Sequence, residues 1–328
     1  MAKYAVIGSN CFTGSHFVSA LLDSAENEVI AISRSNEPAP LFRAYLNCDL
    51  TQYRFYQIDI VKEFQRLRDL LQRERPEYVI NVAALSEVGQ SNFSPIEYYD
   101  INTSAVVRLV NYLREANWLR CYVHISSAEI YGSCDTAINE DQRFNPSTPY
   151  AASKAAGDMH IASVMRQFGF PALTIRSTNV YGARQQLFKI IPRTAIYGKS
   201  GRRLMLHGGG VAMKSFIHIS DVVSGMMAAI KRDKKGVFHF SSPSETTVAE
   251  IVELVCDKLS LRYEDVTEVV EERLGQDQRY WLDCSKARTE LNWRPEISLD
   301  AGIRETVSWV ESNWHLIKSF PLEYQHKV

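Results

Sequence analysis

The sequence has no surplus of either charge. Its 328 residues include 37 lysines and arginines and 38 aspartates and glutamates, so the formal net charge is −1. A chain that binds nucleic acid usually carries a clear basic surplus or a long run of lysine and arginine, and this chain has neither. We therefore expect no nucleic-acid partner, and an anionic ligand would have to be held by a few local cations and helix ends.

Cysteine motifs and long apolar runs are missing as well. The six cysteines are scattered, with no CxxC pair and no Cys/His cluster, so the sequence predicts neither disulfides nor a bound metal. The chain passes from Met1 into an apolar strand without the pattern of a cleavable leader, and no apolar run reaches membrane-spanning length. These features favour a cytoplasmic protein with reduced thiols and no membrane partner.

What the sequence does contain is a regular alternation of short apolar runs with amphipathic stretches. Six runs are predicted to be strands: Tyr4–Ile7, Glu28–Ile32, Phe55–Ile58, Tyr78–Val82, Cys121–Ile125 and Ala172–Ile175. Four stretches between them are predicted to be helices: Gly14–Asp23, Glu63–Gln72, Tyr98–Ala116 and Tyr150–Phe168. This alternation predicts an α/β fold, a doubly wound Rossmann sheet of parallel strands that is covered on both faces.

The pattern changes after about residue 180, where proline, glycine and basic residues become more frequent. A strand is predicted at Phe216–Ile219, and helices are predicted from Asp221, over Thr246–Leu259 and over Leu299–Val310. We expect residues 1–180 to form a dinucleotide-binding Rossmann domain, to which residues 214–245 return. Residues 181–213 and 246–328 are expected to form a smaller C-terminal lobe that binds the substrate.

A glycine-rich turn, Gly8-Ser-Asn-Cys-Phe-Thr-Gly14, follows the first predicted strand and opens the first predicted helix. Glycine allows a sharp turn and a close approach of a pyrophosphate to the backbone, and the start of a helix supplies amides and a positive dipole. A cysteine takes the place of the usual middle glycine. An ordinary strand–helix turn is the alternative. The residues expected to hold a dinucleotide here are Gly8, Cys11, Phe12, Thr13 and Gly14.

Residues that follow three further predicted strands could contact the same dinucleotide. Arg34, after the second strand, offers a guanidinium to a 2′-phosphate, which favours NADP over NAD, although a solvated surface arginine is the alternative. Asp59 and Ile60 follow the third strand, where the carboxylate could accept a hydrogen bond from adenine; a helix N-cap explains Asp59 equally well. Ala83 and Ala84 follow the fourth strand and are small enough for the cofactor to lie against the backbone.

A tyrosine and a lysine, Tyr150 and Lys154, stand four residues apart at the start of a predicted helix. That spacing puts both side chains on one helix face. The ammonium and the charge of a nicotinamide would lower the pKa of the phenol, so that Tyr150 could act as a base. Ser127 ends the fifth strand, at the sheet edge where ligands bind, and could hydrogen-bond the same substrate oxygen. An amphipathic helix without chemistry is the alternative.

The glycine-rich turn, Ser127 and the Tyr150–Lys154 pair resemble the extended short-chain dehydrogenase/reductase family, over nearly the whole chain. The resemblance implies that these residues remove a hydroxyl proton while hydride passes to a tightly bound, recycled nicotinamide cofactor. Glu129 is similar to the glutamate of the nucleotide-sugar 4,6-dehydratases of this family. In those enzymes, oxidation at C4 acidifies the C5 proton, which a carboxylate removes as water leaves from C6. The catalytic residues implied are Ser127, Glu129, Tyr150 and Lys154.

Ala128 departs from the dehydratases of the dTDP-glucose type, which carry at this place an aspartate that protonates the leaving C6 oxygen. Alanine has no proton to give. We therefore expect Glu129 to carry the C5 proton to O6 itself, as the resemblance to the GDP-mannose type implies. A glutamate paired with a structural cation is the alternative.

Two segments of the second half, residues 176–193 and 272–280, resemble substrate-binding segments of the dTDP-glucose type. The resemblance implies that Asn179 and Arg273 contact the diphosphate and that Asp277 contacts the ribose or base. Each cation proposed for the substrate, Lys214 included, could instead be surface charge. The substrate-binding residues implied are Ser86, Asn179, Lys189, Lys214, Arg273 and Asp277.

The expected function is that of a nucleotide-diphosphate-hexose 4,6-dehydratase, with dTDP-glucose or a GDP-hexose, including GDP-N-acetylglucosamine, as the substrate. An NDP-sugar 4-epimerase and a UDP-glucuronate decarboxylase are alternatives on the same scaffold. A non-catalytic dinucleotide-binding sensor is an alternative of another class. The helices over Tyr98–Ala116 and Tyr150–Phe168 could pair with their copies in a homodimer built on a helix bundle, or could simply cover the sheet.

Overall fold

The computed structural model describes residues 2–272 and 277–326. Its centre is a seven-stranded sheet in the order β10-β6-β5-β4-β1-β2-β3, in which every neighbouring pair is parallel. The predicted Rossmann fold is confirmed, and β4 and β6 are buried along their whole length, as a sheet covered on both faces requires. The strands are β1 (Ala2–Ile7), β2 (Asn27–Ser33), β3 (Tyr53–Gln57), β4 (Tyr78–Asn81), β5 (Cys121–Ile125), β6 (Ala172–Ser177) and β10 (Gly236–Phe240).

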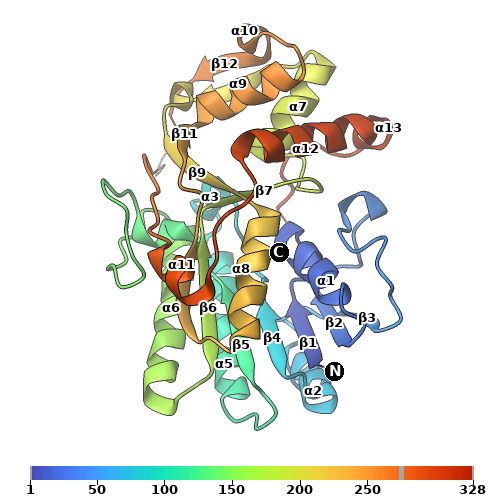
Figure 1. Ribbon diagram of the computed structural model, residues 1–328, viewed down its shortest axis with the longest axis vertical. Helices are drawn as coiled ribbons and strands as arrows, with labels where there is room; N and C mark the ends of the chain where they lie inside the picture. The colour runs from blue at the N-terminus through green and yellow to red at the C-terminus, as the bar shows by residue number, and fades with distance from the viewer. Residues whose placement is uncertain (1, 273–276, 327–328) are drawn as a thin grey trace.

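Helices cover both faces of the sheet (Figure 1), and each face carries a separate hydrophobic core. Side chains alternate along β1, so that Tyr4 and Val6 lie in one core and Ala5 and Ile7 in the other. Helices α1 (Phe12–Leu22), α8 (Ile219–Lys231) and α11 (Ser285–Leu291) contribute to the first core. Helices α2 (Phe64–Glu74), α5 (Ala105–Leu113) and α6 (Pro149–Phe168) contribute to the second.

One predicted helix is interrupted. The stretch Tyr98–Ala116 consists of the end of α4 (Pro95–Tyr99), a π-helical turn at Asp100–Ser104, and α5. The amide of Asn102 in this turn donates to the carbonyl of Leu85 and to the hydroxyl of Ser153, both at 3.0 Å. These bonds join the loop after β4 to α6. An inserted π turn is common at functional sites, and this one fixes the helix that carries Tyr150.

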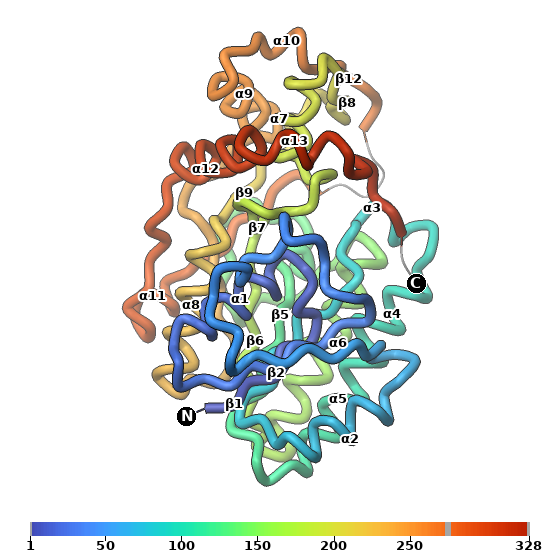
Figure 2. The backbone as a smooth tube through the Cα atoms, turned by 90° about the vertical axis from the view of Figure 1, so that its right-hand side faces the viewer, coloured from blue at the N-terminus to red at the C-terminus, as the bar shows by residue number. Residues whose placement is uncertain are grey.

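The smaller lobe packs around a third core (Figures 1 and 2). Two small sheets belong to it: β11 (Glu245–Thr247), β9 (Met213–His218) and β7 (Asn179–Tyr181) form one, and β12 (Thr267–Val270) and β8 (Leu204–His207) form the other. Its helices are α7 (Ile190–Ser200), α9 (Val248–Lys258), α10 (Tyr263–Val266), α12 (Leu299–Ser312) and α13 (Trp314–Ile317). The remaining short elements are η1 (Pro40–Phe42), α3 (Val88–Ser91), η3 (Ala128–Tyr131) and η4 (Gly208–Gly210).

The C-terminal part of the chain does not stay in one half of the molecule. The side chains of Cys284, Leu291 and Trp293 lie in the first core of the Rossmann sheet, and the Trp293 ring lies 4.6 Å from the ring of Phe240 on β10. We propose that the division near residue 180 holds, that α8 and β10 return to the sheet as expected, and that α11 returns with them.

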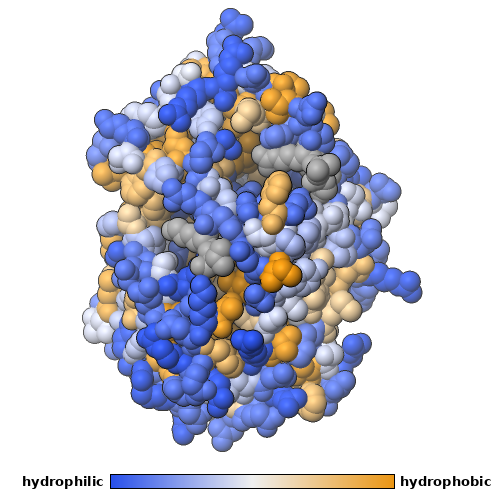
Figure 3. All heavy atoms as spheres, turned by 180° about the vertical axis from the view of Figure 1, so that it is seen from behind, coloured by the Kyte–Doolittle hydropathy of each residue, from blue (hydrophilic) through white to orange (hydrophobic). Residues whose placement is uncertain are grey.

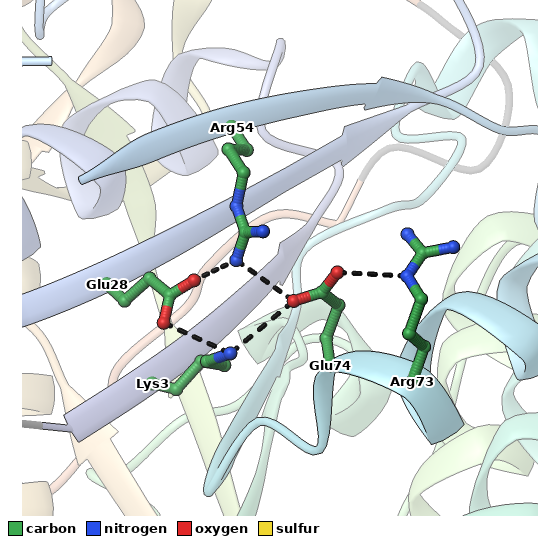
Figure 4. Close-up of polar contacts among 5 residues, drawn as sticks. All are labelled: Lys3, Glu28, Arg54, Arg73 and Glu74. Carbon is green, nitrogen blue, oxygen red and sulfur yellow. Dashed lines mark hydrogen bonds and ion pairs between the residues drawn. The ribbon is translucent and has the colours of Figure 1, made fainter. Parts of the chain in front are cut away.

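Charged side chains join the amino ends of β1, β2 and β3 to the end of α2 (Figure 4). Lys3 on β1 lies 3.0 Å from Glu28 on β2 and 3.4 Å from Glu74 at the end of α2. Arg54 on β3 pairs with Glu28 and lies 2.9 Å from Glu74, which Arg73 also approaches at 3.1 Å. Each carboxylate of this amino-end network therefore faces at least two cations.

Two features of the described residues bear on the surroundings of the protein. No helix among residues 2–272 and 277–326 has the length and apolar character needed to cross a membrane. Seen from behind, the surface carries its hydrophobic residues in separate groups among hydrophilic ones (Figure 3).

Candidate active site

A cavity of about 540 Å³ lies at the carboxyl ends of the sheet strands, where the lobe meets the Rossmann half. This is the place and the size expected of a nucleotide site in a doubly wound fold. The structure brings most of the predicted site residues to its wall. They are Cys11, Phe12, Thr13, Ala84, Ser86, Ser127, Glu129, Tyr150, Lys154, Asn179, Lys189, Lys214 and Asp277.

The two glycines of the first turn act through the backbone. Gly8 has φ +89°, and a Cβ there would lie 2.5 Å from the amide nitrogen of Ala83. A Cβ at Gly14 would lie 2.3 Å from the carbonyl oxygen of Gly8. Gly8, Gly14 and Ala83 do not themselves line the cavity. They allow β1, the loop after β4 and the start of α1 to come together beneath it.

Cys11 is the N-cap of α1. Its Sγ accepts a hydrogen bond from the amide of Gly14 at 3.2 Å, the role that a serine or aspartate oxygen usually fills. Burial raises the pKa of the thiol to about 11, so it stays neutral at physiological pH. A neutral cap adds no negative charge at a helix start that faces a pyrophosphate. The departure from glycine at this position is thus compatible with dinucleotide binding.

The end of β2 supports the glycine turn. The Ser33 hydroxyl accepts from the amide of Asn10 at 3.0 Å and lies 3.2 Å from the Ser9 hydroxyl. The Asn10 side chain donates to the carbonyl of Ser35 at 2.8 Å. Arg34 is half-buried at this strand end and lies outside the cavity wall. Asn10 was not singled out from the sequence, because its role depends on two segments that meet only in the fold.

Asp59 and Ile60 also lie outside the cavity wall. The Oδ1 of Asp59 accepts from the amides of Val61 at 2.8 Å and Lys62 at 3.1 Å. These bonds cap the turn at residues 60–62, whereas the N-cap of α2 is Glu63, so Asp59 is not the expected helix N-cap. The expected contact with adenine stays a prediction. Ile60 is buried in the second core.

Glu129 reaches the cavity because the chain turns at the end of β5. The Ser127 hydroxyl caps the short helix η3 by accepting from the amide of Glu129 at 3.2 Å. Burial raises the pKa of the Glu129 carboxyl to about 7; Lys214 and Lys189 lower it, while Asp277 raises it further. A carboxyl group with this pKa is present in both protonation states near neutrality, so it can accept a proton and give it back.

Tyr150 and Lys154 lie on one face of α6, which the Thr148 side chain caps by accepting from the amide of Ala151 at 3.2 Å. Burial lowers the pKa of Lys154 to about 8, and its Nζ donates to the carbonyl of Ile125 at 2.7 Å. Burial and the Glu129 carboxylate raise the pKa of Tyr150, although a hydrogen bond with Ser127 lowers it.

The lowering of the tyrosine pKa is expected from the ammonium together with the charge of a nicotinamide, and in the protein chain by itself the ammonium does not produce it. The lysine ammonium is engaged with a backbone carbonyl, and the phenol is buried next to a carboxylate. Both effects disfavour a phenolate, so the protein alone does not supply the charge that would activate the phenol.

A buried polar network lies behind this face of α6. Arg176 Nε donates to the Asp158 carboxylate at 2.9 Å, and Arg176 Nη1 donates to the Tyr131 hydroxyl at 2.5 Å. His239 Nε2 lies 2.8 Å from the same hydroxyl. Asp158 follows Lys154 by one helical turn and raises its pKa against the effect of burial. Sequence analysis missed Asp158, whose only signal is the i,i+4 spacing from Lys154.

On the lobe side, Lys214, Asp277 and Tyr280 form one unit. Lys214 donates to the backbone carbonyl of Asp277, and its Nζ lies 3.9 Å from the centre of the Tyr280 ring. The Asp277 carboxylate accepts from the hydroxyls of Ser133 at 3.2 Å, Ser147 at 2.8 Å and Tyr280 at 2.8 Å. This carboxylate holds three side chains and also lines the cavity, so the expected contact with a ribose or a base stays a prediction.

The other expected substrate residues are spread along the cavity. Lys189 at the start of α7 lies 3.0 Å from the carboxylate of Glu87, which follows β4. Asn179 begins β7, and Ser86 is exposed at the wall. Arg273 lies outside the described residues. Within the described residues, no group of three or more His, Cys, Asp or Glu side chains is placed to hold a metal ion.

The family model described as GDP-mannose 4,6 dehydratase matches residues 6–306. The chain belongs to this family. The resemblance to extended short-chain dehydrogenases/reductases of the 4,6-dehydratase type is thereby confirmed, and sequence relatives agree with it. The dTDP-D-glucose 4,6-dehydratase of Homo sapiens is 29% identical over 95% of this chain and 91% of its own length. That of Haemophilus influenzae is 28% identical over 94% and 98%.

Solved structures of the family share the fold closely. The dTDP-glucose 4,6-dehydratase of Streptomyces venezuelae with NAD bound has a TM-score of 0.86 and 29% identity, covering 95% of this chain and 98% of its own. The Bacillus anthracis enzyme in complex with NAD has a TM-score of 0.87 and 26% identity, covering 96% and 98%. The UDP-glucuronic acid 4-epimerase of Bacillus cereus has a TM-score of 0.85 and 25% identity, covering 94% and 99%. The fold alone therefore does not separate elimination from epimerisation.

Proposed function

We propose that this member of the GDP-mannose 4,6 dehydratase family is a nucleotide-diphosphate-hexose 4,6-dehydratase that uses a bound nicotinamide dinucleotide. The observation that carries the proposal is the position of Glu129. Its carboxyl group shares one cavity with Ser127, Tyr150 and Lys154, and its pKa is raised to about 7. Epimerisation at C4 needs no carboxylate base for C5, whereas elimination of water across C5 and C6 does.

The residues of the first turn fit a dinucleotide. The close packing around Gly8 and Gly14 places the start of α1 at the cavity. The cap at Cys11 is neutral, so it adds no negative charge there. When bound, the cofactor supplies a hydride acceptor and a positive charge for this site. NAD is the cofactor bound in the related structures. The preference for NADP that Arg34 suggested stays a prediction. The dinucleotide that raises the melting temperature of the protein more is the one it prefers.

In the proposed reaction, Tyr150 takes the proton of the C4 hydroxyl, with Ser127 hydrogen-bonded to the same oxygen. Lys154 fixes the face of α6 that carries Tyr150 against the end of β5, through its hydrogen bond to the carbonyl of Ile125. Glu129 then accepts the C5 proton and gives it to the leaving C6 oxygen, which departs as water and leaves a C5–C6 double bond. The hydride removed from C4, which the bound dinucleotide would store, would return to C6, and a proton from solvent would replace the one lost from C5, to give the 4-keto-6-deoxy product. Because Ala128 has no polar side-chain atom, one carboxyl group serves as base and then as acid, and a pKa near neutrality suits both tasks.

The test is turnover of a panel of nucleotide hexoses, beginning with dTDP-glucose and GDP-mannose. A dehydratase yields a 4-keto-6-deoxy product, seen by mass spectrometry as a loss of water and by its ultraviolet absorbance in alkali. A product of unchanged mass would mark an epimerase, and release of carbon dioxide from UDP-glucuronate would mark a decarboxylase. Binding of the dinucleotide without turnover of any hexose would favour a non-catalytic dinucleotide-binding sensor.

We also propose a homodimer formed through the helices that cover the second core. Met159 and Phe168 on α6 are 62% and 59% exposed, and Ile96 on α4 is 72% exposed, so these two helices offer large apolar side chains to a second copy. The molar mass in solution tests this. A cytoplasmic location stays a prediction from the sequence.

A further inference from the structure

The last described residues of the chain cross from one half of the molecule to the other. After α13, residues 320–326 run past α3 toward α4 (Figure 2). We call residues 320–326 the C-terminal strap. The family model matches only residues 6–306, so the strap lies beyond the matched part of the chain.

We infer that the C-terminal strap closes one side of the cavity and slows the release of the bound dinucleotide, with Tyr324 as the residue that seals the wall. This inference rests on the proposed function only for the identity of the ligand. Three neighbouring side chains of the strap carry it, and each contacts a different part of the site.

The first of these holds the strap to the lobe. The Glu323 carboxylate accepts a hydrogen bond from the Tyr197 hydroxyl at 2.7 Å, and its other oxygen lies 3.4 Å from Arg193 Nη2. Arg193 and Tyr197 stand one turn apart on α7, and Arg193 lines the cavity. The charge of Glu323 is thus met by a cation and a hydroxyl of the lobe.

Another holds the strap to the Rossmann half. His326 Nε2 contacts the Glu97 carboxylate, and the His326 ring is stacked on the ring of Tyr98, with centroids 6.3 Å apart and planes within 5°. Both partners belong to α4. The Tyr98 ring in turn packs edge-on against Tyr150, with centroids 6.3 Å apart. The contact of the strap with this half is therefore one ring away from the proposed catalytic phenol.

Tyr324 lies between these two anchors and lines the cavity together with Glu323. Its ring packs edge-on against Phe188, with centroids 5.2 Å apart, and its hydroxyl lies 2.9 Å from His326 Nδ1. Phe188 comes directly before Lys189, whose ion pair with Glu87 also joins the lobe to the Rossmann half. The strap and this ion pair thus connect the two halves on the same side of the cavity.

This arrangement has a consequence for ligand exchange. A ligand between the halves leaves faster when the halves separate or when the wall opens, and the strap opposes both movements. Release should therefore require the strap contacts to break first. A cofactor that is recycled within the site gains from slow release, because each loss of it interrupts turnover.

The experiment measures dissociation of NAD from the purified holoenzyme, without any sugar. The variants are Tyr324→Ala and His326→Ala, with Gln325→Ala as the matched control, since the Gln325 side chain is exposed between the other two. We expect both test variants to release NAD about tenfold faster or more, which corresponds to a loss of about 1.4 kcal/mol of stabilisation, and the control to match the wild type. Release from Tyr324→Ala at the wild-type rate would overturn the inference.

A second measurement covers the case in which Tyr324→Ala does not fold. Hydrogen–deuterium exchange on the wild-type chain should show that the amides of residues 320–326 are more protected in the NAD-bound protein than after removal of NAD. Equal protection in the two states would overturn the inference. Neither measurement depends on dehydratase turnover, so a chain that retains NAD through its strap but dehydrates no hexose would refute the proposed function alone.

Discussion

In the seven-stranded sheet, the environment at the amino ends of the strands favours the charged forms of ionisable side chains, whereas the environment at the carboxyl ends disfavours them. At the amino ends, the amino-end network pairs every carboxylate with cations at the surface (Figure 4). Although burial raises the pKa of Glu74, the hydrogen bonds from Arg54 and Arg73 outweigh it and hold that pKa below its usual range. These groups stay ionised and stabilise the fold.

At the carboxyl ends, the corresponding groups are held away from their ordinary protonation states. Burial raises the pKa of Glu129 to about 7 and lowers that of Lys154 to about 8. Such shifts mean that the folded protein holds the charged forms at a cost in stability. In this one sheet, the shifted groups at the carboxyl ends lower the stability of the fold and make it reactive, whereas the ion pairs at the amino ends raise its stability. Substitutions at the two ends should therefore have opposite effects on stability.

The largest expected effect is that of Glu129→Gln. Removal of the only proposed base for C5 should lower the rate of dehydration about 10³-fold. Because a raised pKa marks a carboxylate that the fold disfavours, the same variant should be more stable at pH 7, by about 1–2 kcal/mol. Steady-state turnover and urea denaturation measure the two effects. Retained turnover together with lower stability would show that Glu129 is a structural partner of a cation.

Next in size is Asp158→Asn. This change leaves the buried guanidinium of Arg176 without its ion-pair partner, so the free energy of unfolding should fall by about 3–5 kcal/mol. Asp141→Asn, at an exposed loop position, is the control and should stay within about 0.5 kcal/mol of the wild type. A matched loss in both variants would mean that the network behind α6 contributes no more than a surface charge.

The pH profile of kcat/KM should be bell-shaped. The rate rises as pH passes upward through about 7, because Glu129 must be ionised to accept a proton, and it falls above about 8 as Lys154 loses its charge. Well below pH 7 the rate should drop about tenfold per pH unit. An acid limb near pH 4.5, the ordinary value for a glutamate, would contradict the raised pKa.

The smallest expected effect is that of Glu74→Gln in the amino-end network. The free energy of unfolding of the variant at pH 7 should be about 1 kcal/mol lower than that of the wild type, and its turnover should be unchanged. Since the pKa of Glu74 is lowered in the folded state, its contribution is present above pH 4.5 and is lost as the pH falls through the folded value. The difference between variant and wild type should therefore shrink in acid. A constant difference down to low pH would show that packing, not charge, is responsible.

Much of this organisation could be predicted from the sequence. The apolar runs predicted all six strands of the first half, since strands buried on both faces are apolar throughout. The exception is β3, an only partly buried edge strand of mixed polarity, which Phe55 and its neighbours still indicated. Ser127, Glu129, Tyr150 and Lys154 could be placed together because they follow strand ends or share a helix face, and such positions meet at one edge of a parallel sheet.

Other features depend on contacts that no local pattern indicates. The π turn around Asn102 exists because its amide joins two segments distant in sequence. The Asp277 carboxylate was expected to contact the ligand, yet Ser133 and Ser147, far away in the chain, donate to it. The C-terminal strap has neither a helical nor a strand period, so its path over the cavity emerges only from the contacts of Tyr324 and its neighbours.

The central claim is that the Glu129 carboxyl group removes the C5 proton inside the cavity. Turnover of dTDP-glucose, or of the hexose that the panel selects, in D₂O tests it most directly, with the product analysed by NMR. The account predicts deuterium at C5 of the 4-keto-6-deoxy product from the wild type, and no such exchange with Glu129→Gln. A dehydrated product that keeps its original C5 hydrogen, or exchange at C5 that persists in Glu129→Gln, would contradict it.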